Sequence, residues 1–333
     1  MIDNAIDELK NSKSVEESED SLSIKILPLG QISAAYFVDP ETTNLIAGAL
    51  NNTTAHRGIL QLICASSEFS KLQIKSPKTI SKLMNNFPEL AGDVDEPSVY
   101  ANVIFHCHLY RIQIPEDVKN DFRAMCMSFL RIIPVIIEVA SICGWLTPIV
   151  AALQLSQRVV QALGFETSEL LQIPYITEEI AQKFMSHGVS TVNDLRDKGC
   201  DENGDVFCKQ IIGIENEENK WLEICDAANR YPSISVQAQK VSATSINIHL
   251  QRDIDEDESI GPVFAPYFSI KKNENWWLVL VDQNNNVIET QRISFEREAN
   301  VTIEVSSDLI STQLKVYTLC DSYIGCDLAC DVV

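Results

Sequence analysis

The longest apolar stretch of the chain, residues 131–155, is almost long enough to cross a bilayer, which takes about 20 apolar residues. Glu138 lies inside it, and a carboxylate at the centre of a spanning helix costs roughly 2.5–3.5 kcal/mol. Gly144 is typical of a helix C-terminus, whereas Thr147 and Pro148 are typical of an N-cap and a first helical position. The stretch therefore predicts two core helices joined by a turn rather than a membrane span.

The second of these helices carries apolar residues on more than one face, as expected of a nearly buried helix in a large helical domain. One stripe is apolar at first and ends in two glutamines, and a second stripe is apolar throughout. The first stripe consists of Ile149, Leu153, Gln157 and Gln161, and the second of Leu155, Val159 and Leu163.

Residues 22–167 show further helical segments that begin at prolines, which suit the first helical position because their missing N–H would be unpaired there. These prolines are Pro40, Pro77, Pro97, Pro115 and Pro148. Pro134 differs, because it falls inside the helix expected from about Pro115 to Cys143 and should kink it. We expect a bundle of many helices.

Residues 168–231 contain shorter helical patterns. Gly188 is placed to end one helix and Ser190 to begin the next, which predicts a tight helix-turn-helix unit. This unit resembles a helix-hairpin-helix, which often grips DNA phosphates. Lys183, His187 and Arg196 are accompanied there by four carboxylates, however, so phosphate binding is disfavoured.

Residues 232–333 change to short β-rich runs separated by turn-rich segments. The runs cover residues 233–241, 245–251, 275–282, 287–295, 300–307 and 314–321. About 100 residues of this pattern predict an antiparallel sandwich of the immunoglobulin or fibronectin type III kind. The fold class is therefore multidomain, α then β: a helical bundle, a helix-loop-helix domain and an immunoglobulin-like β-sandwich.

Composition adds limits to this picture. The 333 residues include 47 acidic and 26 basic side chains, a formal net charge of −21, which opposes non-specific binding to nucleic acid. Residues 1–21 are acidic, lack the apolar core of a signal peptide, and are expected to form a solvated tail or linker. The ten cysteines lie in apolar segments without the spacing of a disulfide scaffold, which favours reduced thiols in the cytosol or nucleus.

The search for chemistry is mostly negative. The chain contains no phosphate-binding loop, dinucleotide-binding fingerprint, nucleophile elbow or zinc-protease helix, so we expect neither ATP turnover nor a cofactor. His106 and His108 lie two residues apart in a helical segment and diverge, so they fit core positions better than metal ligands. A zinc site at Cys320, Cys326 and Cys330 is equally disfavoured, because they lack a C-x-x-C pair and a nearby histidine.

Two groups of residues remain as candidates for binding. Trp276 and Trp277 are adjacent on a predicted strand and point to opposite faces, so one should fill the core and the other could contact a protein partner. The second group follows 4, 3, 4 spacing and either forms a solvated face or contacts phosphates or an acidic partner. It consists of Lys71, Lys75, Lys78 and Lys82.

Taken in order, several segments resemble the accessory unit shared by the Ski-two-like helicases and the protein-translocation factor Sec-sixty-three. They include "LPLGQISAAYFV", "RGILQLICASSEF", "VYANVIFHCHLYRI", "GWLTPIVAALQLSQRVVQALGF" and "ICDAANRYPSISV", and the resemblance covers about residues 22–333. The ending, with "GPVFAPYF", "NENWWLVLVD" and "VYTLCDSYIGCD", resembles most closely the C-terminal copy in large spliceosomal RNA helicases of the Brr-two type, from the U-five particle.

This resemblance implies an ATPase core outside the present chain, and a helicase cassette that is itself inactive. Such a cassette serves as a docking surface for other spliceosomal proteins and as a modulator of the active N-terminal cassette, in the nucleus and without membrane contact. The long bundle helix corresponds to the "ratchet" helix that lines the nucleic-acid channel in active members, with Arg131 at the usual arginine. Two departures weaken an RNA-translocating role: Lys75 and Lys78 stand where relatives have other residues, and Pro134 replaces a common glutamine.

The first hypothesis is therefore a non-enzymatic protein-interaction module of a splicing helicase, with weak or absent RNA contact. A nucleic-acid-guiding channel element, using Arg131 and the lysines, is the alternative from another class. The translocation-factor branch fits less well, because this sequence shows neither a membrane span nor a J-type domain.

Overall fold

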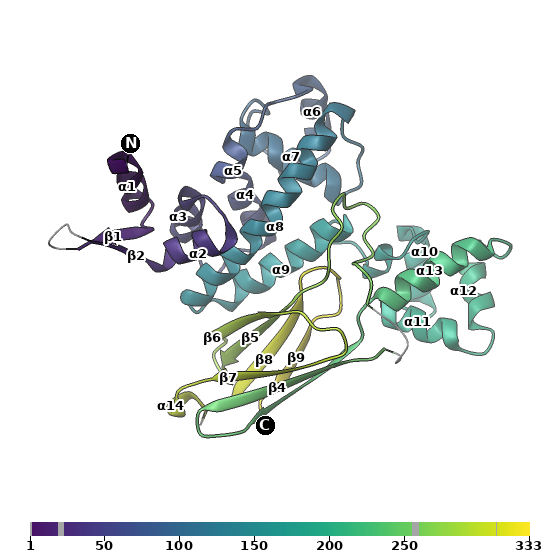
Figure 1. The fold of residues 1–333 in the computed structure, drawn as a ribbon. Helices are drawn as coiled ribbons and strands as arrows, with labels where there is room; N and C mark the ends of the chain where they lie inside the picture. The colour runs from purple at the N-terminus through teal and green to yellow at the C-terminus, as the bar shows by residue number, and fades with distance from the viewer. Residues whose placement is uncertain (1, 19–22, 255–259, 311) are drawn as a thin grey trace. The chain divides into compact units, whose positions relative to one another are not determined.

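The computed structural model describes residues 2–18, 23–254, 260–310 and 312–333 (Figure 1). Contacts within the chain divide it into two compact units. The first unit consists of Met1–Ser156 and Asn284–Thr290, and the second of Gln157–Gln283 and Gln291–Val333.

The first unit is a bundle of α-helices (Figure 1). Its helices are α2 (Pro28–Tyr36), α3 (Pro40–Ala49), α4 (His56–Cys64), α5 (Ser67–Ser70), α6 (Pro77–Met84), α7 (Pro97–Leu109), α8 (Lys119–Ile142) and α9 (Leu146–Gln161), the last of which continues into the second unit. The expected proline starts are confirmed at α3, α6 and α7, and Pro115 precedes the 3-10 turn Glu116–Val118 that leads into α8. The helix α8 continues through Pro134, and the kink there stays a prediction.

The residues between α8 and α9 form a tight C-terminal cap. Gly144 has a φ of +73°, its N–H donates to Ser141 O at 2.9 Å, and the N–H of Trp145 donates to Ala140 O at 2.9 Å. This is a Schellman arrangement, which favours glycine because its backbone lies in the left-handed region. The predicted break inside residues 131–155 is thus confirmed. The N-cap at Thr147 and the helix start at Pro148 are wrong, because α9 already begins at Leu146.

The core of the bundle is built around Phe105 of α7. Its ring lies 6.2 Å from Phe69, 5.7 Å from Phe122 and 5.5 Å from Phe129, measured between ring centroids. The last two rings belong to α8, so this helix packs against α7 through aromatic contacts of the kind that stabilise cores. The α7 helix is buried nearly all round, which is why its apolar residues show no single stripe.

By length and composition alone, one helix among the described residues could cross a membrane. It is α8 with its preceding turn, Glu116–Ile142, and 61% of its most apolar window is buried inside the structure. This helix also forms a polar contact, since Tyr36 Oη donates to Glu138 Oε1 at 2.9 Å. The burial and this contact fit the expected core helix.

The N-terminal residues are more ordered than the tail predicted for residues 1–21. The structure has a helix α1 (Ile2–Asn11), and β1 (Val15–Glu17) pairs antiparallel with β2 (Ile24–Ile26). The N–H of Leu27 donates to Ser14 O at 2.9 Å, which ties this hairpin to the start of α2. Residues 19–22 of the expected tail lie outside the described part of the chain.

The second unit begins with four short helices, α10 (Glu178–Ser186), α11 (Val192–Cys200), α12 (Gly204–Ile212) and α13 (Glu218–Arg230). Gly188 follows α10 with a φ of +81°, as expected at a helix end. Thr191 rather than Ser190 caps α11, because its side chain and that of Asp194 form a reciprocal capping box.

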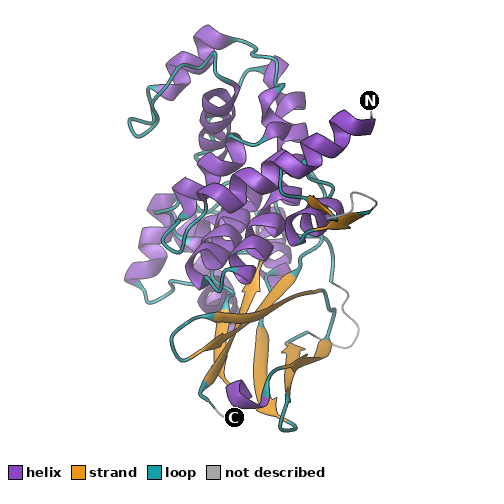
Figure 2. Ribbon diagram, turned by 90° about the vertical axis from the view of Figure 1, so that its left-hand side faces the viewer, coloured by secondary structure: helices purple, strands orange, loops and turns teal. Residues whose placement is uncertain are grey.

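Two antiparallel sheets follow α13 along the chain, and of their strands only β6 contains residues of the first unit (Figures 1 and 2). One has the strand order β3-β4-β7 and the other β6-β5-β8-β9. The strands are β3 (Ile234–Lys240), β4 (Ser245–Arg252), β5 (Trp276–Asp282), β6 (Val287–Ile293), β7 (Glu298–Glu304), β8 (Leu314–Cys320) and β9 (Leu328–Asp331), with a short helix α14 (Ser307–Ile310) before β8. The six predicted strands are all present, and β9 was not predicted.

We expect Leu153→Asp to abolish cooperative unfolding of the chain. Leu153 is fully buried in α9, and an unpaired buried carboxylate costs several kcal/mol, a large part of a typical domain's stability of about 5–15 kcal/mol. Far-UV circular dichroism during a thermal melt measures the loss. Thr147→Asp is the matched control, since Thr147 is exposed on the first turn of the same helix. A Leu153→Asp melt within a few degrees of the wild type would contradict the prediction.

Candidate functional site

The two adjacent tryptophans are both buried, so the expectation that one of them is exposed is wrong. Trp276 is 0% exposed and Trp277 is 1% exposed. They begin β5, an inner strand that is buried at six consecutive residues and therefore on both of its faces. Trp276 Nε1 donates to Glu274 Oε1 at 2.9 Å, and the Arg292 guanidinium lies 6.0 Å from the ring centre of Trp277. Neither tryptophan is available at the surface.

The four lysines from Lys71 to Lys82 do not share one face. Lys71 follows the end of α5, Lys75 lies between helices, and Lys78 and Lys82 are one turn apart on α6. Lys75 Nζ pairs with Asp121 Oδ2 at 2.7 Å, and this hydrogen bond raises the pKa of Lys75. One of the four charges is therefore already engaged inside the bundle.

Arg131 lies on α8 and is directed at the end of another helix. Its Nη1 donates to Phe37 O at 3.0 Å, and its Nη2 donates to Ser128 Oγ at 3.4 Å. Phe37 ends α2 in the left-handed backbone region with a φ of +53°, which is costly for a residue with a Cβ. The guanidinium thus supports the end of α2, a role that the sequence did not reveal.

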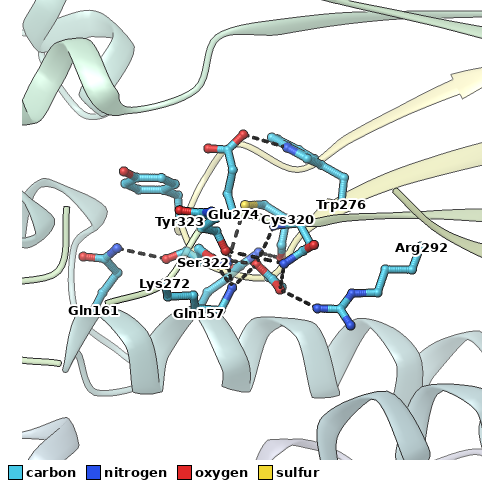
Figure 3. A network of polar contacts seen from close by, with 12 residues as sticks. Gln157, Gln161, Lys272, Glu274, Trp276, Arg292, Cys320, Ser322 and Tyr323 are labelled. Atoms are coloured by element: carbon cyan, nitrogen blue, oxygen red, sulfur yellow. Dashed lines mark hydrogen bonds and ion pairs between the residues drawn. The ribbon is translucent and has the colours of Figure 1, made fainter. Parts of the chain in front are cut away.

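A group of buried polar contacts surrounds residues 320–327, which join β8 to β9 and are called the 320–327 segment below (Figure 3). From the last turns of α9, Gln157 Nε2 donates to Cys320 O at 2.9 Å and to both carboxylate oxygens of Asp327 at 3.0 Å. Gln161 Nε2 donates to Ser322 O at 2.9 Å. Both glutamines are 2% exposed, so they supply buried carbonyls with donors that water cannot provide.

A third glutamine and a tyrosine hold the middle of the 320–327 segment. Gln172 Nε2 donates to Ile324 O at 2.9 Å, and the N–H of Ile324 donates back to Gln172 Oε1 at 2.8 Å. Tyr231 Oη donates to the same Ile324 carbonyl at 3.1 Å. Gly325 follows with a φ of +94°, and a Cβ there would collide with the Glu169 carboxylate. Only glycine fits this position.

Buried ion pairs complete the network. Lys272 Nζ lies 2.5 Å from Asp321 Oδ1 and donates to Ser322 Oγ at 2.7 Å, and the partly exposed Arg292 approaches Asp321 Oδ2 at 3.9 Å (Figure 3). Arg252 pairs with Glu274, the residue that also accepts from Trp276. Burial lowers the pKa of Arg252. Such pairs are costly to break because one uncompensated charge would remain buried.

Asp327 is the titratable centre of the network. Burial raises its pKa to about 6, although the N–H of Cys320 at 2.8 Å and the Gln157 amide both act in the opposite direction. The carboxyl is therefore protonated more readily than an exposed aspartate, and its two donors belong to the chain itself. The arrangement supports packing rather than a reaction on a bound molecule.

Several buried cysteines and one buried histidine are used in packing. Burial raises the pKa of the Cys64 and Cys126 thiols and brings that of Cys107 to about 12, which makes them poor nucleophiles. His106 is buried with Nδ1 2.9 Å from Asn102 O, and burial lowers its pKa. Over the described ranges, no three His, Cys, Asp or Glu side chains are grouped to hold a metal ion.

One feature of the sequence indicated the polar network around the 320–327 segment. Gln157 and Gln161 continue the stripe of Ile149 and Leu153, so two amides occupy positions that the pattern assigns to the core. A buried amide needs partners, and this predicts a buried polar contact without saying where the partners lie. The carbonyl partners are more than 160 residues further along the chain.

Comparison with known proteins identifies relatives over almost the whole chain. The sequence profile of the Sec63 Brl domain matches residues 26–333. The Drosophila melanogaster U5 small nuclear ribonucleoprotein 200 kDa helicase is 29% identical over 349 residues, which covers 98% of this chain and 16% of the helicase. The Homo sapiens protein of the same name is 27% identical, covering 98% of this chain and 15% of its own length. The activating signal cointegrator 1 complex subunit 3-like protein of Dictyostelium discoideum is 28% identical, with 98% and 15% covered. The chain thus spans about one sixth of the length of these relatives.

Replacing Gln157 with Leu should destabilise the chain by about 1–3 kcal/mol. The change leaves Cys320 O without its amide donor and Asp327 with one donor fewer, and an unsatisfied buried group costs that much. Urea unfolding measured through tryptophan fluorescence gives the difference. Gln239→Leu, on the exposed side of β3, is the control and should change stability by less than about 0.5 kcal/mol. Equal midpoints for the two variants would show that the Gln157 amide is not needed.

We expect Asp327 to make stability fall as pH rises from about 4 to 6. Its pKa is raised in the folded chain, so the folded state binds more protons than the unfolded state in that window, and each pKa unit is worth about 1.4 kcal/mol. This stabilisation is complete below the unfolded pKa of about 4 and is lost above pH 6. Urea unfolding of wild type and Asp327→Asn across pH 4.5–7.5 tests it: the stability difference between them should change by roughly 2 kcal/mol over the window. A constant difference would contradict the assignment.

Proposed function

Because the chain belongs to the Sec63 Brl domain family, we propose that it is a non-catalytic accessory and protein-interaction module of a pre-mRNA splicing RNA helicase. In this proposal it docks other spliceosomal proteins in the nucleus and modulates the active N-terminal cassette of its parent protein. The relatives named as U5 small nuclear ribonucleoprotein helicases support this context. Because the chain spans about one sixth of them, ATP hydrolysis and RNA unwinding are assigned to the rest of the parent protein.

The observation that carries the proposal is that the buried polar side chains are hydrogen-bonded within the chain. The donors to its backbone carbonyls are Gln157, Gln161, Gln172 and Tyr231. A network that is satisfied internally makes a surface rigid, and a rigid surface binds partners at a low entropy cost.

The domain boundaries belong to the proposal as well. We propose a bundle over residues 22–167, a helix-loop-helix domain over 168–231 and an immunoglobulin-like sandwich over 232–333. The sheet orders β3-β4-β7 and β6-β5-β8-β9 support the last assignment, because sandwiches of this kind consist of two antiparallel sheets in one compact domain.

The geometry gives less support to the alternative of a nucleic-acid-guiding element. Lys75 is paired with Asp121, and Arg131 is bonded to Phe37 O, so neither is held ready for a phosphate. Lys71 remains exposed after α5, and Lys78 and Lys82 remain as a pair on α6. They are set against a net charge of −21, which repels a phosphate backbone at long range. We therefore propose protein partners rather than RNA.

Two measurements on the purified chain test the proposal. Immobilised on beads, it should capture spliceosomal proteins from nuclear extract treated with ribonuclease. Fluorescence polarisation with single-stranded RNA should show binding weaker than about 10 μM near physiological salt, within the non-specific range.

A chain that captures no spliceosomal protein would overturn the docking role. Submicromolar RNA binding with a steep salt dependence, lost in a variant with Lys71, Lys75, Lys78 and Lys82 all changed to Ala, would favour the channel element. Nucleotide turnover that persists through every purification step would contradict the non-catalytic assignment.

A further inference from the structure

A groove of about 250 Å³ lies between α4 and α7 in the first unit. Its lining combines small and apolar residues with two side-chain amides. The lining residues are Gln61, Cys64 and Ala65 from α4 and the residue after it, Leu90 and Ala91 from the loop before α7, and Ser98, Val99 and Asn102 from α7. Gln61, Ala65 and Ala91 are exposed, so the groove is open to solvent.

The loop wall of this groove is held against α7 by Gly92. Its φ is +118°, and a Cβ there would lie 2.7 Å from Val99 Cγ2, closer than side chains approach one another. Val94 of the same loop is 9% exposed, and its burial holds the loop in place. The conformation of this loop therefore requires glycine at residue 92.

The end of the groove carries an unused hydrogen-bonding atom. Asn102 Oδ1 is shielded from solvent and accepts no hydrogen bond from any described residue. A buried acceptor without a donor costs about 1–3 kcal/mol, and rotation of the Asn102 side chain toward the groove would let a peptide N–H satisfy this oxygen. A side-chain amide can accept from a peptide N–H and donate to a peptide carbonyl, so Asn102 and Gln61 suit an extended backbone.

The charges at the rim are negative. Residues 89–96 contain four exposed carboxylates, Glu89, Asp93, Asp95 and Glu96. The nearby Arg57 forms an exposed ion pair with Glu89 at 3.9 Å, and this pair neutralises little of the negative charge of the rim. A rim of this sign attracts a basic partner and repels an acidic one.

We propose that this groove docks an extended, lysine- or arginine-rich segment of a partner protein. The backbone of the segment lies along α4 and α7 between the amides of Gln61 and Asn102, small apolar side chains sit over Cys64 and Ala65, and basic side chains reach the carboxylates of residues 89–96. The nine residues of α4 span roughly 13 Å, the length of about four extended residues. This inference rests on the proposed function and names the chemistry of one partner.

The test selects a random twelve-residue peptide library on the full chain and measures the enriched peptides by fluorescence polarisation. We expect basic peptides with interspersed small apolar residues. Ala91→Trp, which fills the groove without changing charge, should weaken their binding at least tenfold.

A triple variant, Glu89→Gln with Asp95→Asn and Glu96→Gln, should also weaken binding at least tenfold. The matched control removes three carboxylates from the second unit, through Glu296→Gln, Glu298→Gln and Glu304→Gln, and should change affinity less than twofold. Circular dichroism checks that each variant is folded. Equal losses from the two triple variants, together with no effect of Ala91→Trp, would reduce the binding to overall charge and overturn the proposal. Enrichment of acidic peptides, no enrichment, or self-association of the chain that is lost in Ala91→Trp would overturn it too.

Capture from nuclear extract separates this inference from the proposed function. A wild-type chain that captures no spliceosomal protein contradicts the proposed function, whatever the groove binds. If the wild type captures such proteins and Ala91→Trp captures the same set in equal amounts, the proposed function stands and the groove assignment fails.

Discussion

The second unit depends on one constraint: a connection between two strands is buried, and its peptide groups need partners. Loops usually lie at the surface because water satisfies their backbone. Here the carbonyls of Cys320, Ser322 and Ile324 are reached by Gln157, Gln161 and Gln172 instead. These amides come from α9 and from the 3-10 turn Glu169–Gln172, so satisfying the connection also fixes those segments against the strands within the unit.

The same constraint explains why Trp276 is buried. Strand β5 is followed in the sheet by β8, whose end carries the 320–327 segment. Trp276 belongs to the cluster of buried residues that includes Leu163, Tyr231 and Tyr323, drawn from the helices and from that segment. Successive side chains of a strand point to opposite faces of the sheet, so the sequence assigns each tryptophan to a face. Whether that face is exposed to water depends on what covers the sheet, and here both faces are covered.

Local patterns predicted the elements well, because the forces that define them act over a few residues. Proline starts, the glycine cap at Gly144 and the six strand patterns all depend on neighbours in the sequence. The elements that were not predicted show the limit of local sequence patterns. Strand β9 is four residues long and mostly exposed, so it has no alternation to recognise, and it is held by pairing with β8. The helix α1 lies in a segment whose composition favours a tail.

The candidate site was harder to predict, because its contacts join distant residues and change what a charge can do. Arg131 and Lys75 are basic side chains whose spacing allows phosphate contact, yet each is bonded to a neighbour within the bundle. In the second unit, Lys272 and Arg252 are likewise paired with Asp321 and Glu274. Each internal pair removes equal and opposite charges from the surface, so the net charge of −21 is carried by a surface with fewer basic groups than the composition indicates. Electrostatic complementarity then acts mainly through the sign of the charge, because negative charge attracts basic groups and repels phosphates at long range.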